Sequence, residues 1–359
     1  TEKIHAEMMK GNFPAPILPG VESFAVPERT DFIGVGDFNR DGRQDLVTAA
    51  RGGLNLYLLA GDGRGNFAPP ERIEMPGAIT ALLADDVNNY DSMPDLIVGI
   101  GGDGSAPRAL IFHNKLEMFA DTPDALDLPT EATSFAVGQM DSDVYKDLVI
   151  AAGYEVLVAR GRDNLAGEKR KDEMERIGFY SPVRAVTTGE FLFDREARTE
   201  IAVLTADGAV NVAARGNIDR RPYSDAEIKT ISEKRRKRDY KGIETFKKSL
   251  SARRGGGSAG WEIAQTLIEA SGSNIGPAAK LLSSSLAGLE TDDLMLVDSR
   301  SSQMRLIQTS QKGMDNQAAV VDLNVENGAV AAAALRLNVD TKRDIGVLRE
   351  DAEAPTVML

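Results

Sequence analysis

The sequence predicts an all-β protein whose fold is a β-propeller of six four-stranded blades, and three observations support this prediction. An acidic loop followed by an apolar strand recurs along the chain. The copies lie about 50 residues apart, which is the period of propeller blades with four short strands each. Glycine, aspartate and proline separate the apolar stretches, as they do in hairpin turns. We therefore expect residues 1–359 to form a single propeller domain, and a seventh blade stays open if further sequence supplies it.

Six copies of the pattern share one register, which is marked by an acidic residue in front of the second strand. The clearest copy reads GVGDFNRDGRQDLVTAA and begins at Gly34. The strands of this unit are expected at residues 32–36, 46–50, 54–60 and 67–75. A β-sandwich with coincidental spacing is the rival interpretation, and six copies in one register disfavour it. The register residues are Asp45, Asp95, Asp147, Glu200, Asp293 and Asp344, at intervals of 50, 52, 53, 93 and 51 residues.

The long fourth interval contains an insertion at residues 215–260, which falls in the fourth blade. This segment is rich in Lys, Arg and Glu, and Ser224 or Asp225 is a candidate helix N-cap. We expect a charged helical segment that returns to the blade through the flexible stretch RRGGGSAG. The run KRRKR, within residues 233–239, could be read as a nucleic-acid signal, but the acidic residues around it favour a solvated helix face. A partner-binding arm and a protease-sensitive site stay open as alternatives.

The N-terminal region resembles a strand of the first unit. Residues 11–20 (GNFPAPILPG) match residues 65–77 (GNFAPPERIEMPG), where the fourth strand of that unit is expected. The last repeat, by contrast, supplies three strands only. We therefore expect residues 11–20 to complete the last blade, which would cover an exposed strand edge.

The composition disfavours several classes of function. The net charge of −13 argues against a general nucleic-acid binder, because phosphate neutralisation needs a basic surface. The chain has no cysteine and only two histidines, a supply that disfavours thiolate metal sites and the usual catalytic triads. We therefore do not expect an enzyme. No apolar run approaches the roughly 18 residues of a membrane span, so the chain is not expected to cross a membrane.

The first acidic loop, DFNRDGRQD, is suited to a hard cation. Calcium takes six to eight oxygen ligands in flexible geometry, and a short loop with acids at alternate positions can wrap one. Gly42 permits the sharp turn. An EF-hand is excluded because its twelfth position, here Thr48, would have to be a glutamate followed by a helix, whereas LVTAA predicts a strand. Positions 1, 3, 5 and 9 are Asp37, Asn39, Asp41 and Asp45, and position 7 would contribute the backbone carbonyl of Arg43.

These residues resemble a known family. The stretch GDFNRDGRQDLV, and more loosely DDVNNYDSMPDLIV, is similar to the FG-GAP/VCBS repeats of integrin alpha-subunit propellers and of many bacterial surface proteins. The resemblance covers nearly the whole chain outside the insertion. It implies a calcium-binding β-propeller in which each cation lies in the hairpin loop between two blade strands.

The later copies match this motif less well. In the third copy Gln139 replaces the first acid, while Arg336 does so in the sixth, where its guanidinium could take the place of the cation. The second copy has one extra residue around Tyr90. We expect one firm calcium site in the first loop and one or two weaker sites. The ligands implied for the weaker sites are Asp86, Asn88, Asp91 and Asp95 in the second loop, and Asp141, Asp143 and Asp147 in the third.

The resulting hypothesis is a calcium-stabilised propeller from an exported or cell-surface bacterial protein that acts in adhesion or assembly. Its partner would be another protein or a second copy of itself. The calcium would be structural, because ion binding that pins a hairpin adds to folding stability. Millimolar extracellular calcium would fill such a site. The alternative is a propeller that binds or degrades a surface glycan at its central face, although Trp261, the lone tryptophan, is expected to pack between blades.

Overall fold

The computed structural model describes fourteen stretches of the chain. These are residues 24–87, 93–102, 104–114, 118–141, 145–161, 174–195, 198–251, 259–286, 291–301, 303–309, 318–325, 329–335, 344–349 and 356–358. The N-terminal segment 11–20, predicted to close the last blade, lies outside them.

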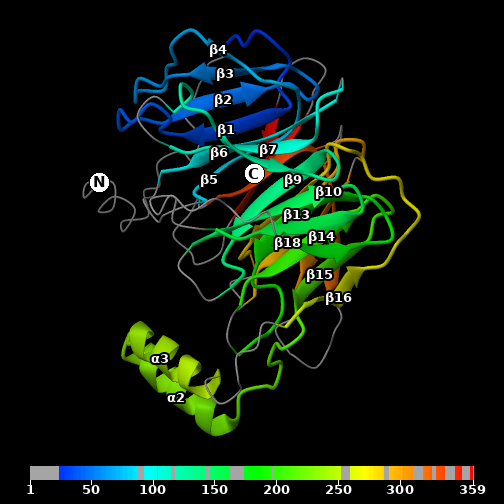
Figure 1. The fold of residues 1–359 in the computed structure, drawn as a ribbon. Helices are drawn as coiled ribbons and strands as arrows, with labels where there is room; N and C mark the ends of the chain where they lie inside the picture. The colour runs from blue at the N-terminus through cyan, green and yellow to red at the C-terminus, as the bar shows by residue number, and fades with distance from the viewer. Residues whose placement is uncertain are drawn as a thin grey trace.

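The described residues form six antiparallel sheets, each built from consecutive strands (Figure 1). Five sheets have four strands, and the last has three among the residues described. The first sheet contains β1 (Phe32–Gly36), β2 (Asp45–Ala49), β3 (Asn55–Leu59) and β4 (Glu71–Glu74), and the second contains β5 (Ala78–Asp85), β6 (Asp95–Gly101), β7 (Arg108–Phe112) and β8 (Asp124–Asp127). The third contains β9 (Ala132–Gly138), β10 (Asp147–Ala152), β11 (Glu155–Ala159) and β12 (Glu175–Gly178), and the fourth contains β13 (Val183–Gly189), β14 (Glu200–Thr205), β15 (Val210–Arg215) and β16 (Trp261–Ile268). The fifth contains β17 (Lys280–Ser284), β18 (Asp293–Val297), β19 (Gln303–Gln308) and β20 (Ala319–Asn324), and the sixth contains β21 (Ala329–Leu335), β22 (Asp344–Arg349) and β23 (Thr356–Met358).

The acidic register of the sequence corresponds to one position of the fold. All six register residues, from Asp45 to Asp344, are the first residue of the second strand of a sheet. In the first sheet Asp45 pairs with Gly36, the last residue of β1, so the acidic loop is the turn between these strands. The four strands expected in the first unit are present. Strand β4 is shorter than predicted because Pro69 and Pro70 lack the N–H that a ladder needs.

Strand β10, the second strand of the third sheet, is apolar after its first residue because neighbouring sheets cover both of its faces. In β10 the side chains of Leu148 and Ile150 belong to a core shared with the second sheet, and those of Val149 and Ala151 to a core shared with the fourth. All six residues of β10 are buried. Successive strand residues point to opposite faces, so a strand between two cores loses the alternation of a half-exposed strand.

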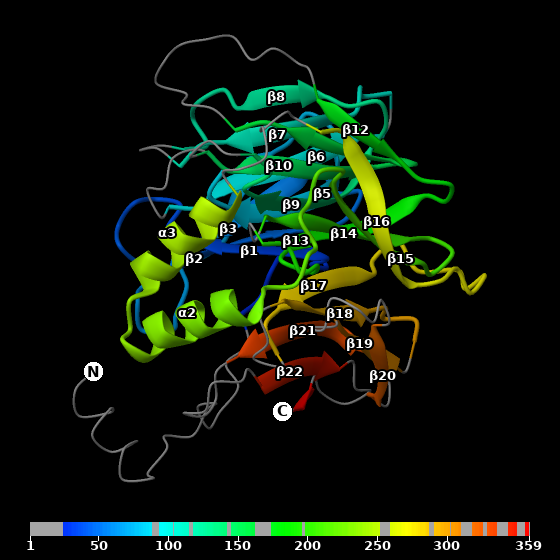
Figure 2. The same cartoon turned by 90° about the horizontal axis from the view of Figure 1, so that it is seen from below.

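The sheets follow one another in space as they do in sequence. Each first strand contacts the first strand of the next sheet, from β1 and β5 through to β17 and β21. A separate apolar core fills each space between consecutive sheets. Figure 2 shows the same succession from below. This arrangement is all-β and propeller-like.

The insertion between β15 and β16 contains two helices, α2 (Asp225–Arg236) and α3 (Tyr240–Ser251). Ser224 is the N-cap of α2 and forms a capping box with Glu227. The two helices pack on each other and lie apart from the sheets (Figure 1). In the described part of the chain no helix has the length and apolar character needed to traverse a bilayer.

Candidate functional site

The loop that connects β1 and β2 is wound tightly around its own polar side chains. The two carboxylate oxygens of Asp37 accept hydrogen bonds from the N–H groups of Asp41 (3.0 Å) and Gly42 (2.8 Å). Asn39 Oδ1 also accepts from the Asp41 N–H, at 2.9 Å. Asp41 Oδ1 in turn accepts from the N–H of Arg43 at 2.9 Å. Three side-chain oxygen groups are thus gathered on one short turn, which is the chemistry that a hard cation prefers.

The same loop is fastened to the second sheet. Arg40 has a positive φ of 60°, and its Nε donates to Asn114 Oδ1 at 3.2 Å. Asn114 Nδ2 donates back to the carbonyl of Asp37 at 2.9 Å and to that of Pro94 at 3.0 Å. A side chain from one sheet therefore fixes the position of the loop in its neighbour.

Asp45, the predicted ligand at position 9, faces the protein interior. It is fully buried, and its two oxygens accept from the N–H groups of Phe38 and Gly61, each at 2.9 Å. A Cβ on Gly61 would lie 2.1 Å from the carbonyl oxygen of Gln44, so only glycine permits this approach. Asp45 thus ties the loop between β1 and β2 to the turn after β3, and we call this arrangement the carboxylate latch.

The carboxylate latch recurs in the neighbouring sheets. In the second and third sheets the register residue accepts from the second residue of its own loop and from the residue two places beyond the third strand, and in the fifth sheet the bond to the loop residue is present. The loop residue is apolar and its side chain is buried, so the latch also seats a core side chain. Asp95 bonds Val87 (3.1 Å) and Asn114 (2.7 Å), Asp147 bonds Met140 and Gly161 (2.8 Å each), and Asp293 bonds Leu286 (3.1 Å).

A comparison with known families decides the nature of this repeat. Residues 37–98, which run from the first loop into β6, match the family model described as FG-GAP-like repeat. The chain carries an FG-GAP-like repeat. The match confirms the resemblance that the sequence of the first and second loops predicted.

Comparisons with individual proteins are less informative than this family match. No curated protein matches the chain in sequence. Two solved structures of BBS1N in complex with ARL6DN are similar to it. The structure soaked with mercury has 13% identity and a TM-score of 0.47, covering 85% of this chain and 71% of its own. The structure soaked with lead has 12% identity and a TM-score of 0.47, covering 89% and 77%.

The other loops of the FG-GAP-like repeat are described in part. Asn88 and Asp91 of the second loop, and Asp143 of the third, lie outside the described residues. Asp86 is buried, and Asp141 lies 3.7 Å from the Arg160 guanidinium. Across the residues that the structure does describe, no three acidic or histidine side chains converge as a metal centre requires. The ligand roles of Asp37, Asn39, Asp41 and the carbonyl of Arg43 in the first loop stay predictions, as do those of Asp45, Asp95 and Asp147.

The fourth sheet carries a variant of the latch that has a glutamate. Glu200 Oε2 accepts from the N–H groups of Phe191 (2.7 Å) and Leu192 (3.1 Å). Its other oxygen, Oε1, is buried and has no hydrogen-bond partner among the described residues. Burial raises the pKa of Glu200 to about 8, although the two N–H groups oppose this shift. The carboxyl group is therefore mostly protonated at neutral pH.

A second polar cluster joins the outer strands of the third and fourth sheets. Glu175 on β12 accepts from Nη2 of Arg215 (3.1 Å) on β15 and from Nη2 of Arg160 (2.8 Å). The Arg215 guanidinium also lies 4.1 Å from the ring centroid of Trp261. Burial acts to raise the pKa of Glu175, but the hydrogen bonds from Arg215 and Arg160 outweigh it and lower this pKa to about 2. Both ends of the insertion, Arg215 and Trp261, are thus held against the third sheet.

Replacing Glu175 by glutamine should destabilise this junction. The variant removes the charge that faces a guanidinium whose side chain is only 11% exposed, and we expect a loss of about 1–2 kcal/mol because Glu175 is itself partly exposed. The contribution of Glu175 is present above its unfolded pKa near 4.5 and is lost as the pH falls through about 2. Urea unfolding followed by the fluorescence of Trp261 measures both effects.

Glu155→Gln is the matched control for this experiment. Glu155 pairs with the exposed Arg176 at 3.1 Å in the same sheet, so its removal should change stability by less than about 0.5 kcal/mol. Equal losses for the two variants would show that the bridge between the sheets adds nothing beyond a surface ion pair.

Proposed function

We propose that this chain is a calcium-stabilised β-propeller that serves as a protein–protein interaction module outside the cell or at its surface. The observation that carries the proposal is the FG-GAP-like repeat together with the wound oxygen-rich loop at its start. Propellers commonly present binding surfaces on loops held by a rigid scaffold.

In this proposal the six sheets are six blades of a closed ring. Each sheet already packs on the next through its first strand. The sixth sheet has three strands in the described part of the chain, and residues 11–20 would supply its fourth. Such closure protects strand edges from pairing with other chains.

Calcium would be held at the first loop by the side chains of Asp37, Asn39 and Asp41 and by the carbonyl of Arg43. When bound, the ion neutralises clustered carboxylates and adds its binding energy to folding. The residues of the chain hold the loop in shape through the Asp37 and Asn39 hydrogen bonds and through Arg40 and Asn114. Calcium at extracellular, millimolar levels fills even a weak site of this kind, which supports an exported location.

The carbohydrate alternative gains no support from Trp261. The indole packs partly buried against the core between the third and fourth sheets, with the Arg215 guanidinium over its ring. The guanidinium therefore covers a face of the Trp261 ring, whereas a stacked sugar would need a ring face to be free.

Asp41→Ala should abolish the stabilisation that calcium confers. Asp41 is exposed, so without calcium we expect little change in melting temperature. In the unaltered protein, calcium at about 100 times its Kd should add about 2.7 kcal/mol, and the variant should lose most of this gain. Calorimetric titration, with thermal melts in chelator and in calcium, measures both quantities.

Asp62→Ala is the control for the calcium experiment. Asp62 is an exposed acid in the neighbouring turn after β3 and likewise accepts backbone N–H groups, from Arg64 and Asn66. Its removal should leave the calcium response intact. An unaltered protein whose melting temperature is the same in calcium and in chelator would refute the calcium proposal.

A further inference from the structure

The α2–α3 hairpin is rooted in the fourth sheet through a buried arginine. Arg195, in the loop between β13 and β14, is 8% exposed. Its guanidinium donates to both oxygens of Glu227, in the first turn of α2, at 3.1 and 2.8 Å. It also donates to the carbonyls of Arg221 and Pro222, each at 2.9 Å. A bidentate pair of this kind fixes direction as well as distance.

Further contacts make the root rigid. The Tyr223 ring lies 5.0 Å from the Arg195 guanidinium and 5.4 Å from the Phe193 ring. The hydrogen bond from Arg195 lowers the pKa of Glu227 to about 2, so the pair stays charged across the physiological range. The buried Arg195 therefore holds the hairpin in one direction, which a solvated spacer would not require.

The hairpin lies at the end of the fourth sheet that corresponds to the end of the first sheet where the acidic loop lies. In an antiparallel meander the turns after the first and third strands lie at the same edge, and the bond from Gly61 to Asp45 joins two such turns in the first sheet. The hairpin replaces the turn after the third strand of the fourth sheet. It projects from this edge, away from the sheets (Figure 1).

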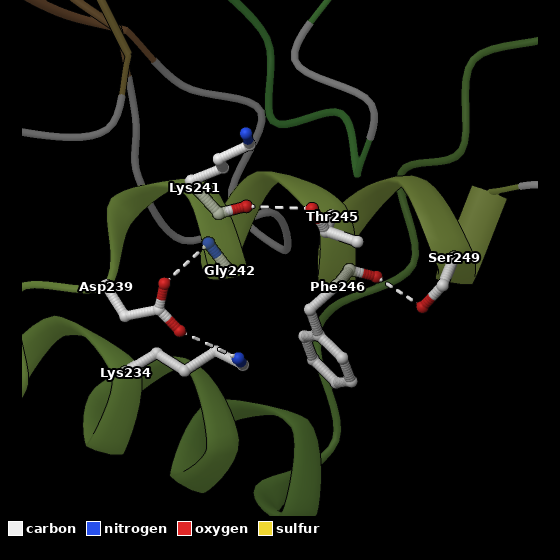
Figure 3. A pocket seen from close by; sticks show the side chains of 7 residues that line it. All are labelled: Lys234, Asp239, Lys241, Gly242, Thr245, Phe246 and Ser249. Carbon is white, nitrogen blue, oxygen red and sulfur yellow. Dashed lines mark hydrogen bonds and ion pairs between the residues drawn. The ribbon is translucent and has the colours of Figure 1, made fainter.

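Two large apolar side chains of the hairpin are turned inward, whereas Ile228 of α2 is exposed. Ile231 of α2 is buried, and Phe246 of α3 points toward α2 in Figure 3. The space between the helices, about 500 Å³ in volume, is also lined by Lys234 and Asp239, which form an ion pair at 3.1 Å. What the hairpin presents outward is therefore mainly polar and charged.

The hairpin is rich in basic residues. Residues 225–251, which hold both helices, contain nine Lys or Arg and five acids, a net charge of +4 in a chain of net −13. Four consecutive basic residues at the end of α2 and in the following turn are exposed, namely Arg235, Arg236, Lys237 and Arg238. We call these four residues the basic tip.

We propose that the basic tip is the docking site for an acidic protein surface. This inference rests on the proposed interaction function and names the chemistry of its partner. Charge complementarity points to clustered carboxylates. A bilayer-binding amphipathic helix has to expose an apolar face, whereas Ile228 is the one large apolar side chain that the described part of the hairpin exposes. A polynucleotide would meet repulsion from the acidic remainder of the chain.

The test uses the full chain and a fluorescein-labelled oligoglutamate peptide at low and physiological salt. The triple variant Arg235→Gln/Arg236→Gln/Lys237→Gln keeps helix-forming side chains and removes three charges. We expect it to weaken peptide binding by at least about tenfold. The control Arg64→Gln/Arg72→Gln/Arg176→Gln removes the same charge from exposed positions on two strands and in the turn after β3, and it should change the affinity by less than about twofold. Circular dichroism verifies that the hairpin is folded in both.

Several outcomes would overturn the proposal. One is peptide affinity that the triple variant leaves unchanged. A second is tighter binding, through the same residues, to phosphatidylserine vesicles or to single-stranded DNA. A third is a dimer in light scattering that depends on the basic tip, which would make a second copy the occupant. Asp41→Ala should bind the peptide normally, so failure of the calcium proposal and failure of this one are distinguishable.

Discussion

Asp45→Asn is expected to lower the free energy of unfolding by about 3 kcal/mol, in calcium and in chelator alike. The asparagine side chain has the same shape, but one of its two oxygens is replaced by an NH2 group. That group would face a backbone N–H of either Phe38 or Gly61, both of which donate to the carboxylate at 2.9 Å. One charge-assisted hydrogen bond is weakened and one buried N–H is left without an acceptor.

The measurement is urea unfolding of the variant with and without a chelator. Asp62→Asn is the control, because Asp62 also accepts backbone N–H groups but is exposed, so water replaces the lost acceptor and stability should hardly change. A loss for Asp45→Asn that appears only in calcium would show that Asp45 acts as a metal ligand and not as a latch.

Glu200→Gln is expected to make the protein more stable at alkaline pH. The pKa of Glu200 in the folded protein is about 8, well above its unfolded value of 4.5. The stability contribution of the protonated group is therefore complete below about pH 4.5 and is lost as the pH rises through about 8. A shift of this size is worth about 4–5 kcal/mol in the fully ionised state. Glutamine keeps an oxygen for the N–H groups of Phe191 and Leu192 and carries no charge to bury.

The difference in unfolding free energy between the two proteins, measured from pH 4 to pH 9, isolates this group from others that titrate. It should be small at pH 4 and should grow in favour of the variant toward pH 9. A difference that stays constant across this range would mean that the pKa of Glu200 is not raised in the folded protein. Glu175→Gln supplies a contrast, because its effect is expected at low pH.

The fold was predictable because its signal is local and repeated. The six register residues all begin second strands, because in each sheet the acid stands directly before the apolar run of that strand. Strands such as β10 read as continuous apolar runs because two cores bury them. The helices of the insertion were expected from Ser224, which caps α2.

The site was predictable only where its contacts are short in sequence. The winding of the first loop joins residues up to five positions apart, and the motif contains it. The second bond of Asp45 reaches 16 residues along the chain, the Arg195 pair with Glu227 reaches 32, and the bonds between Arg40 and Asn114 reach 74. No spacing rule gives these partners, because each depends on how two separate turns or sheets meet.

The carboxylate latch involves only a few residues of each loop, and the other loop residues lie outside it. Its acid, its buried apolar residue and the turn after the third strand hold the register, while the exposed residues between them hold the shape of the loop. The fourth loop has the acid of the latch and Arg195 but not the oxygen-rich pattern, and two helices follow the third strand of the same sheet. A change between residues 39 and 44 should therefore alter the first loop and its response to calcium, whereas a change at Asp45 should alter the packing of the sheet itself.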